Sequence, residues 1–278
     1  MTILELTALV WCGSLLAGFV GSLTGLGGGV VLTPLLTLLF GIDIRYAIGA
    51  AIVSVIATSS GAAAAYVREG FSNIRIGMLL EIATTLGAVV GASLAVRLPT
   101  TAIAIIFALV LLYSAYASTQ IDHTKEAQGE PDRLTRYFKL DSSFPTPEGP
   151  RFYRVYNVGA GSGMMFGAGV LSGLLGIGAG AMKVIAMDQV MRIPFKVSTT
   201  TSNFMIGVTA AASAGVYLQR GYIDPGLAFP VMVGVLLGSL LGARLLPAAK
   251  TRVLRKVFAG AIAALAVEML VQALRGKM

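Results

Sequence analysis

Cysteine and histidine are almost absent from this sequence. One cysteine, Cys12, and one histidine, His123, occur among 278 residues. Disulfide frameworks need paired cysteines, and zinc or haem sites need several Cys or His ligands close together. We therefore expect no metal site and no cofactor, and the scarcity argues against redox enzymes and metalloenzymes.

Charged residues are also scarce, at 12% of the chain, whereas hydrophobic residues make up 56%. With a mean hydropathy of +0.81, the chain has more apolar surface than one soluble core could bury. The composition therefore predicts a membrane protein. The net charge of +8 does not indicate nucleic-acid binding, because basic residues in membrane chains usually mark cytoplasmic loops.

The N-terminal region has no basic residue before Arg45, and Glu5 stands where a secretory signal would carry positive charge. We therefore expect no cleaved signal peptide. Apolar stretches separated by short charged turns run along the chain, at residues 4–40, 44–67, 75–96, 101–119, 158–190, 197–218, 225–246 and 253–274. Most can cross about 30 Å of hydrocarbon at about 1.5 Å per residue, so the sequence predicts an all-α, polytopic transmembrane bundle.

A tandem duplication covers much of the chain. Residues 25–92 recur without a gap as residues 176–243, at a constant offset of 151 positions. The identical pairs include Gly25 with Gly176, Gly27 with Gly178, Gly29 with Gly180, and Tyr66 with Tyr217. Duplicated apolar units with glycine clusters at matching depths are typical of secondary transporters, in which the substrate binds where the two copies meet. Duplication kept only for packing is the alternative.

Glycines interrupt the first apolar segment of each repeat, and the piece that follows is too short for a full helical span. We therefore expect broken or re-entrant first helices, and two short full crossings, which preserve the same parity, are the alternative. A returning piece gives each repeat an odd number of crossings and inverts the second copy. With Lys183 set aside as intramembrane, that topology places 15 basic residues on the cytoplasmic side and five on the other side. Four plain crossings per repeat would place 11 on the cytoplasmic side and nine on the other side. The positive-inside rule then favours two inverted repeats, with both termini outside the cytoplasm.

These features divide the chain into a first transmembrane repeat, residues 1–119, a cytoplasmic linker, residues 120–157, and a second transmembrane repeat, residues 158–278. The linker is the one hydrophilic stretch, with six acidic and six basic residues and prolines at Pro145, Pro147 and Pro150. Such a composition is typical of a tether between two halves. A gate or a regulatory arm is the alternative.

Each glycine cluster falls between two helical pieces and should expose the N-terminus of the second piece within the membrane. Free backbone N–H groups and the helix dipole attract anions there, and glycine lets a ligand approach the backbone. The residues predicted to bind the substrate are Gly25, Gly27, Gly28, Gly29 and Val30 in the first copy, and Gly176, Gly178, Ala179, Gly180 and Ala181 in the second. Helix packing is the alternative, and we favour it for the pairs Gly87/Gly91 and Gly238/Gly242.

Four side chains are further candidates for the site. Lys183 lies within an apolar run, where an ammonium costs about 2.5–3.5 kcal/mol and needs a ligand or a partner such as Asp188 or a carbonyl. Thr200 and Asn203 offer uncharged donors that suit sulfur or phosphorus oxyanions, or that cap and connect helices. Glu81 is a candidate carrier of a coupling proton, and a paired carboxylate is the alternative.

Both repeats thus carry a glycine cluster, followed by a segment rich in Ser and Thr and by apolar spans with small-residue motifs. In this the chain resembles the TauE/SafE family of membrane permeases, also called sulfite exporters, over residues 8–118 and 158–274. The resemblance implies transport of small sulfur-containing anions such as sulfite, thiosulfate or organosulfonates across a bacterial inner membrane. Ala179 replaces the middle glycine of the second cluster, and Ile185 stands where the first copy has Pro34, so the half-sites need not contribute equally.

The sequence therefore predicts a secondary transporter, an exporter of small anions, and a multi-pass inner-membrane location. A passive anion channel and a non-transporting membrane scaffold are the alternatives. We assign no catalytic residue and expect no enzyme activity, because clustered His, Cys or paired intramembrane acids are lacking. The expected partners are the small anionic substrate and the lipid bilayer, and the sequence leaves a homo-oligomer open.

Overall fold

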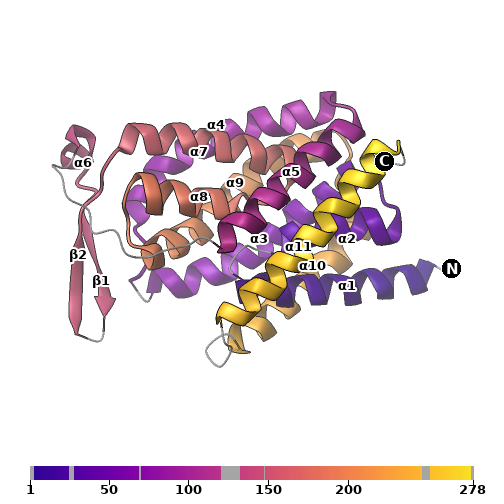
Figure 1. Cartoon of the computed structure of the whole chain (residues 1–278), viewed down its shortest axis with the longest axis horizontal. Helices are drawn as coiled ribbons and strands as arrows, with labels where there is room; N and C mark the ends of the chain where they lie inside the picture. Colours follow the sequence, from indigo (N-terminus) through magenta and orange to yellow (C-terminus); the bar gives the residue numbers. More distant parts are fainter. Residues whose placement is uncertain are drawn as a thin grey trace.

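The computed structural model describes residues 3–24, 28–68, 70–119, 132–146, 148–245 and 251–276. Its helices are α1 Ile3–Thr24, α2 Gly29–Phe40, α3 Ile44–Arg68, α4 Ile74–Arg97, α5 Thr100–Thr119, α6 Arg133–Phe138, α7 Val158–Leu175, α8 Gly180–Ile185, α9 Phe195–Gln219, α10 Pro225–Leu245 and α11 Thr251–Leu274. A π-helix, η1 Ala186–Val190, continues α8, and the strands β1 Ser142–Thr146 and β2 Gly149–Tyr153 form one hairpin. The predicted all-α helical bundle is confirmed (Figure 1).

Apolar side chains cover much of the outside of this bundle. Met78, Ile82, Leu86 and Val89, which follow one another along α4, are all exposed. A soluble protein would bury such a stripe, whereas lipid solvates it. Among the described residues, two helices are long and apolar enough to cross a membrane, α4 and α7, and shorter apolar stretches lie in α1, α2, α3, α5, α10 and α11.

The two repeats interleave instead of packing as separate halves. Helix α4 of the first repeat packs along α7 of the second, and α1 packs along α10 in the same way. The partners exchange when each helix is replaced by its copy at the 151-residue offset. The copies α3 and α9 pack on each other, as do α5 and α11. The bundle therefore has an approximate two-fold arrangement.

Glycines let the exchanged helices approach closely. A methyl group added at Gly87 or Gly91 of α4 would overlap the backbone of α7 at Phe166 or Val170. In the copy, one added at Gly238 of α10 would overlap the backbone of α1. The prediction that these glycines form helix contact faces is confirmed for Gly87, Gly91 and Gly238. Gly242 belongs to α10, but its packing is not described.

The copies α3 and α9 run antiparallel. Gly49, near the start of α3, faces the carbonyl of Tyr222 just after α9, whereas Gly207 within α9 faces the hydroxyl of Ser59 further along α3. A two-fold axis that relates antiparallel helices lies perpendicular to them. This geometry is expected of inverted repeats, and how the halves face a membrane stays a prediction.

The second glycine cluster reverses the chain. Helix α7 begins where η1 ends, because Tyr156 N–H donates to the Met191 carbonyl at 3.1 Å and the Asn157 amide donates to the Val190 carbonyl at 3.2 Å. The segment α8–η1 thus returns to the end of the bundle at which α7 starts, as expected for a re-entrant pair. In the first repeat, Gly13 of α1 packs against Leu35 of α2.

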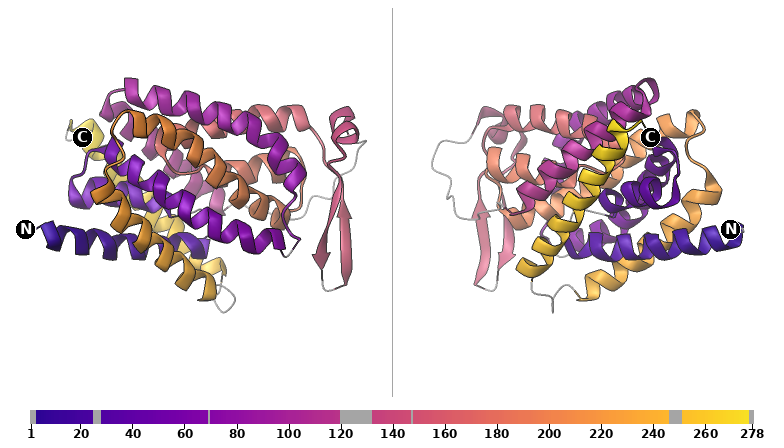
Figure 2. Two further views of the ribbon diagram at one scale, coloured as in Figure 1. Left: turned by 180° about the vertical axis from the view of Figure 1, so that it is seen from behind. Right: turned by 45° about the vertical axis from the view of Figure 1, so that its right-hand side comes forward.

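The linker forms ordered structure at one end of the bundle. Helix α6 and the β1–β2 hairpin lie together there, while the start of α1 and the end of α11 lie toward the other end (Figures 1 and 2). We call these the linker end and the far end. Strands were not expected in this linker, because Pro145 and Pro150 disfavour them. The two prolines face each other in a two-stranded sheet whose outer edges need no partner.

Hydrogen bonds of Asn73 attach this linker to the first repeat and join the first repeat to the second. The amide of Asn73, just before α4, donates to the Leu140 carbonyl at 3.0 Å and to the Tyr153 hydroxyl at 2.8 Å. The backbone N–H of Asn73 donates to the Thr201 hydroxyl of α9 at 3.0 Å. Leu140 and Val155 are buried in the same apolar cluster as residues of α4, α7, η1 and α9. The boundaries proposed for the linker and the two repeats stay a prediction.

Candidate functional site

A buried polar chain joins the two repeats in the middle of the bundle. Lys183 of α8 donates from Nζ to the Thr209 hydroxyl of α9 at 2.6 Å. The Thr209 hydroxyl in turn lies 2.7 Å from Oε1 of Glu81 on α4 and can donate to it. Lys183 is 0% exposed and Glu81 is 7% exposed. An ammonium and a carboxylate are thus connected through one hydroxyl.

The local structure explains how Lys183 reaches this position. The chain takes left-handed backbone angles at Gly176, Gly178 and Ala179, with φ of 67°, 71° and 46°. Two glycines adopt this region readily, whereas an alanine there costs about 1 kcal/mol. Helix α8 then begins, the Lys183 N–H bonds to the Ala179 carbonyl, and the side chain leaves the first turn toward α9. The π-helical continuation is a feature often found at functional sites.

Glu81 is only partly satisfied by this network. The Thr85 hydroxyl, one turn further along α4, also donates to Oε1 at 3.2 Å. The other carboxylate oxygen, Oε2, is buried without a hydrogen-bond partner. A buried ion pair is stable only when its charges compensate each other, so Lys183 and Glu81 depend on one another. Lys183 thus has a hydrogen-bond partner in the structure, and Thr209 is the residue that sequence reasoning missed.

Thr209 was overlooked because hydroxyl residues are common in membrane helices and usually bond to their own helix. Its copy in the first repeat is Thr58, whose hydroxyl lies near the carbonyls of Ser54 and Val55 of its own helix. The sequence feature that could have drawn attention to Thr209 is that both repeats have a threonine at this position. That feature could not show that Thr209 lies beside Lys183 and Glu81, whereas Thr58 has no ionisable residue at the corresponding positions.

The glycine clusters of the two repeats lie against each other. A methyl group added at Gly29 would lie 3.1 Å from the Gly176 carbonyl and 2.8 Å from Val55. One added at Gly178 or Gly180 would lie 2.8 Å from Ile206, the copy of Val55. The described members of the predicted site, Gly28, Gly29, Val30, Gly176, Gly178, Ala179, Gly180 and Ala181, are thus assembled from both halves, whereas Gly25 and Gly27 lie outside the described residues.

Both helices that follow the clusters begin without a side-chain cap. No side chain of the N-cap residues, Gly28 for α2 and Ala179 for α8, bonds to the first turn. The N-cap residues thus provide no side-chain acceptor for the first N–H groups of either helix, which lie at the positive end of its dipole. Val55 and Ile206 cover the glycines in this structure, and both are buried.

The structure separates Thr200 from this site. Its hydroxyl lies 3.0 Å from the Phe71 carbonyl, at the linker end, where it joins the start of α9 to the turn before α4. Asn203 is half-buried, four residues before Gly207, on the α9 face that packs on α3. Instead, Ser202 reaches the second cluster and donates to the Gly180 carbonyl at 3.3 Å. Any role of Thr200 or Asn203 in binding stays a prediction.

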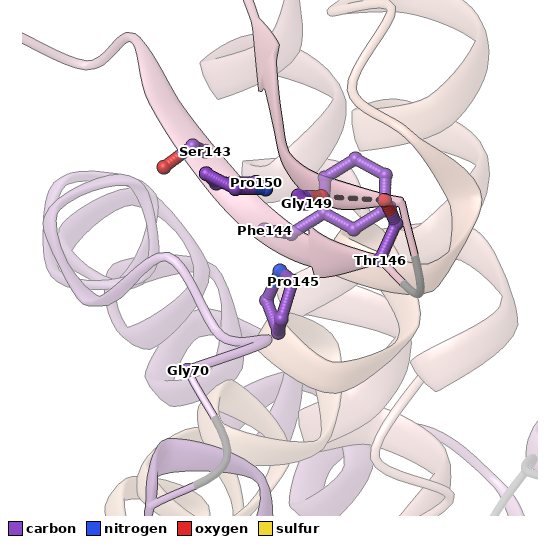
Figure 3. Close-up of a pocket in the computed structure, with 7 residues that line it drawn as sticks. All are labelled: Gly70, Ser143, Phe144, Pro145, Thr146, Gly149 and Pro150. Atoms are coloured by element: carbon purple, nitrogen blue, oxygen red, sulfur yellow. Dashed lines mark hydrogen bonds between the residues drawn. The ribbon is translucent and has the colours of Figure 1, made fainter.

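A separate cavity of about 400 Å³ opens at the linker end. The β-hairpin and Gly70 line it, with the Phe144 ring and the prolines Pro145 and Pro150 among its walls (Figure 3). It has no ionisable lining residue and none of the residues predicted to bind substrate. Across the part of the chain that the structure describes, no three His, Cys, Asp or Glu residues are grouped so that they could hold a metal ion.

Comparison with known proteins gives consistent matches over most of the chain. A family model described as "Sulfite exporter TauE/SafE" matches residues 10–269. The "Probable membrane transporter protein YunE" of Bacillus subtilis (strain 168) is 26% identical over 236 residues, which cover 82% of this chain and 84% of that protein. The "Probable membrane transporter protein YdhB" of the same organism is 27% identical over 232 residues, covering 82% and 86%. No solved structure matches significantly.

Proposed function

Because the chain belongs to the sulfite exporter TauE/SafE family, we propose that it exports small sulfur-containing anions such as sulfite, thiosulfate or organosulfonates. Membrane transport as such follows from the family and from the relatives, which are named membrane transporters. The finer proposal is a multi-pass secondary carrier of the inner membrane. Its site comprises the backbone N–H groups at the two glycine clusters and the ammonium of Lys183.

The observation that carries this proposal is the position of Lys183. It is the fully buried cation of α8, one turn beyond an uncapped helix N-terminus. An ammonium and free N–H groups at membrane depth together form the kind of environment that attracts an anion. The first cluster adds a second uncapped N-terminus at Gly28, which lies next to the Gly176 turn through Gly29.

The distribution of basic residues supports an inverted orientation of the repeats, which is part of the proposal. Arg75 bonds to the Lys139 carbonyl of the linker at 3.1 Å, and Lys196 lies at the linker end over the Phe71 ring. At the far end, Arg45 donates to the Leu98 carbonyl at 2.7 Å and stacks on Tyr222. Basic residues are more frequent near the linker end, so we place that end in the cytoplasm.

We also propose that transport proceeds by alternating access around the central site. The glycine clusters belong to different halves, and Val55 and Ile206 close over them from α3 and α9. Movement of one half against the other would separate these two side chains and admit the anion from one side at a time.

The test compares two variants that differ only at Lys183. Glu81→Gln and the double variant Lys183→Met/Glu81→Gln are purified, checked for monodispersity, and reconstituted in proteoliposomes for sulfite and thiosulfate flux. The double variant leaves no charge in the buried network, so loss of folding does not explain its behaviour. We expect saturable flux to disappear only when Lys183 is replaced, while Arg154→Met, which removes an exposed linker cation, leaves flux unchanged.

Equal flux through Glu81→Gln and the double variant would refute the role of Lys183. Flux that never saturates and does not respond to a gradient would favour a channel over a carrier.

A further inference from the structure

Lys183 already has an anionic partner in this structure, and that partner belongs to the other repeat. Glu81 lies in the first repeat and Lys183 in the second, and Thr209 connects them by hydrogen bonds of 2.6 and 2.7 Å. A substrate anion that binds the ammonium therefore competes with the carboxylate of Glu81. The proposal below rests on the proposed function, because it concerns the same cation.

Charge balance decides what happens to Glu81 when an anion binds. With Lys183 as an ammonium and Glu81 as a carboxylate, the buried network is neutral. A second anion beside Lys183 would leave a net negative charge at membrane depth, which is costly because the surroundings solvate it poorly. The network becomes neutral again if Glu81 takes up one proton.

The structure provides a place for that proton and a hydroxyl that can adapt to it. Oε2 of Glu81 is buried without a hydrogen-bond partner, so it is free to carry hydrogen. The Thr209 hydroxyl has two acceptors within reach, Oε1 of Glu81 at 2.7 Å and the Met205 carbonyl of its own helix at 2.9 Å. It can turn from the first acceptor to the second when Glu81 is protonated.

Lys183 is the charged group that interacts with Glu81. Helix α7, which packs along α4, has no ionisable residue in its sequence. The ionisable groups of the other neighbouring elements are Lys196 and Tyr217 on α9, Asp188 on η1, Arg45, Tyr46, Tyr66 and Arg68 on α3, and Arg75 and Arg97 on α4 itself. Those of α4 and α9 lie near the helix ends, away from the level of Glu81.

The first repeat has no equivalent pair. At the 151-residue offset, Lys183 corresponds to Leu32, Thr209 to Thr58 and Glu81 to Met232. Only the threonine is retained. The two repeats therefore provide one Lys–Thr–Glu network, whose one carboxylate can take up one proton.

We propose that Glu81 is a built-in competitor of the substrate for Lys183, so that each monoanion bound takes up one proton and the two are carried together. In the empty site, the ammonium of Lys183 balances the carboxylate of Glu81. In the loaded site, the ammonium balances the anion and Glu81 is a neutral carboxylic acid. Both states are neutral, and transport of a monoanion with its proton is electroneutral.

The experiment counts protons on binding. Purified protein in detergent is titrated with methanesulfonate, a sulfonate that does not itself titrate near neutral pH, by calorimetry in buffers of different ionisation enthalpy. Where Glu81 is ionised in the empty site, we expect one proton taken up per anion. The apparent Kd should then rise about tenfold per pH unit in that range, as linkage requires.

Two variants make the result specific. Glu81→Gln should bind methanesulfonate without proton uptake and with a Kd that does not change with pH, and the bound anion should raise its melting temperature more than that of the wild type. Glu268→Gln, which alters an exposed carboxyl of α11, should keep the wild-type proton count. The wild-type count needs no variant, so poor folding of Glu81→Gln would not prevent the test.

Methanesulfonate binding without proton uptake in the wild type would overturn this inference and leave the proposed function standing. If neither methanesulfonate, sulfite nor thiosulfate binds, the proposed function fails and the inference fails with it.

Discussion

Removing either end of the Lys183–Thr209–Glu81 network should destabilise the protein far more than removing both. Lys183→Met leaves the carboxylate of Glu81 buried with only the hydroxyls of Thr209 and Thr85 for partners. Glu81→Gln leaves the ammonium, which is 0% exposed, without its counter-charge. Breaking a buried pair in this way costs about 3–5 kcal/mol, whereas replacing both partners by neutral side chains is often close to neutral.

The double variant Lys183→Met/Glu81→Gln should therefore recover most of the lost stability. The amide oxygen of the new glutamine can still accept from Thr209, and Met fills most of the space of the lysine stem. Single costs of about 3–5 kcal/mol each and a nearly neutral double variant correspond to a coupling free energy of about 6–10 kcal/mol between the two positions. Because about 1.4 kcal/mol is a factor of ten, each single variant should lower the folding equilibrium constant by at least a hundredfold.

The assay is equilibrium unfolding in detergent micelles without anions, followed by far-UV circular dichroism and by the fluorescence of the one tryptophan. That residue, Trp11, lies where α1 packs on Gly234 of α10, so its emission reports separation of the two repeats. Glu268→Gln should change stability by less than about 0.5 kcal/mol, as is usual for exposed sites. Single-variant losses below about 1 kcal/mol that simply add in the double variant would show that the two side chains are not coupled.

Two further predictions concern the closure of the site and the attachment of the linker. Val55→Ala together with Ile206→Ala should speed anion flux into proteoliposomes, because both side chains cover the glycine clusters. Truncation of Ile206 should also lower the free energy of unfolding by about 2–5 kcal/mol. Slower or equal flux through folded protein would contradict the gating role. Burial raises the pKa of the Tyr153 phenol above its ordinary value of 10.0, against the opposing effect of the hydrogen bond from Asn73. The stability that neutral Tyr153 contributes is complete below that ordinary value and is lost as the pH rises through the raised one. The amide protection factors of β1 and β2, corrected for intrinsic exchange, should therefore fall above about pH 10 in the wild type and stay constant in Tyr153→Phe.

Much of the architecture could be predicted from the offset of 151 residues and from the glycines. The matching clusters predicted that each first helix would be interrupted, and the return of α8–η1 to the start of α7 agrees with this. The pairs at Gly87 and Gly91 predicted close helix contact, because small residues drive association in lipid. Which helices exchange partners could not be predicted, because the offset shows which segments correspond but not which segments pack together.

The linker and the polar network were harder to predict for different reasons. The hairpin contains prolines, and local composition therefore indicated a tether between the two halves, whereas the hydrogen bond from Asn73 to Leu140 fixes the linker against the bundle. Glu81 and Lys183 were each recognised as an intramembrane charge, but their pairing depends on the packing of α4 against α9. Glu81 and Thr209, which meet there, are 128 positions apart in the sequence. Thr200 was predicted to bind substrate, but its hydroxyl lies 3.0 Å from the Phe71 carbonyl, in a turn of the other repeat that the local sequence around Thr200 does not reveal.

The asymmetry between the copies has a physical reason. The first half keeps its glycine cluster and uncapped helix N-terminus, but Leu32 and Met232 replace the lysine and the glutamate. A backbone N-terminus needs no counter-charge when the site is empty, whereas every buried ammonium needs one. A second network would add the insertion cost of two more charges, about 2.5–3.5 kcal/mol each, and would hold a second proton. Under the proposed function, one charged half-site and one neutral half-site would bind a single monoanion and still leave the empty carrier neutral. The first copy would then avoid the cost of two more buried charges, and a backbone donor would remain on each side of the anion.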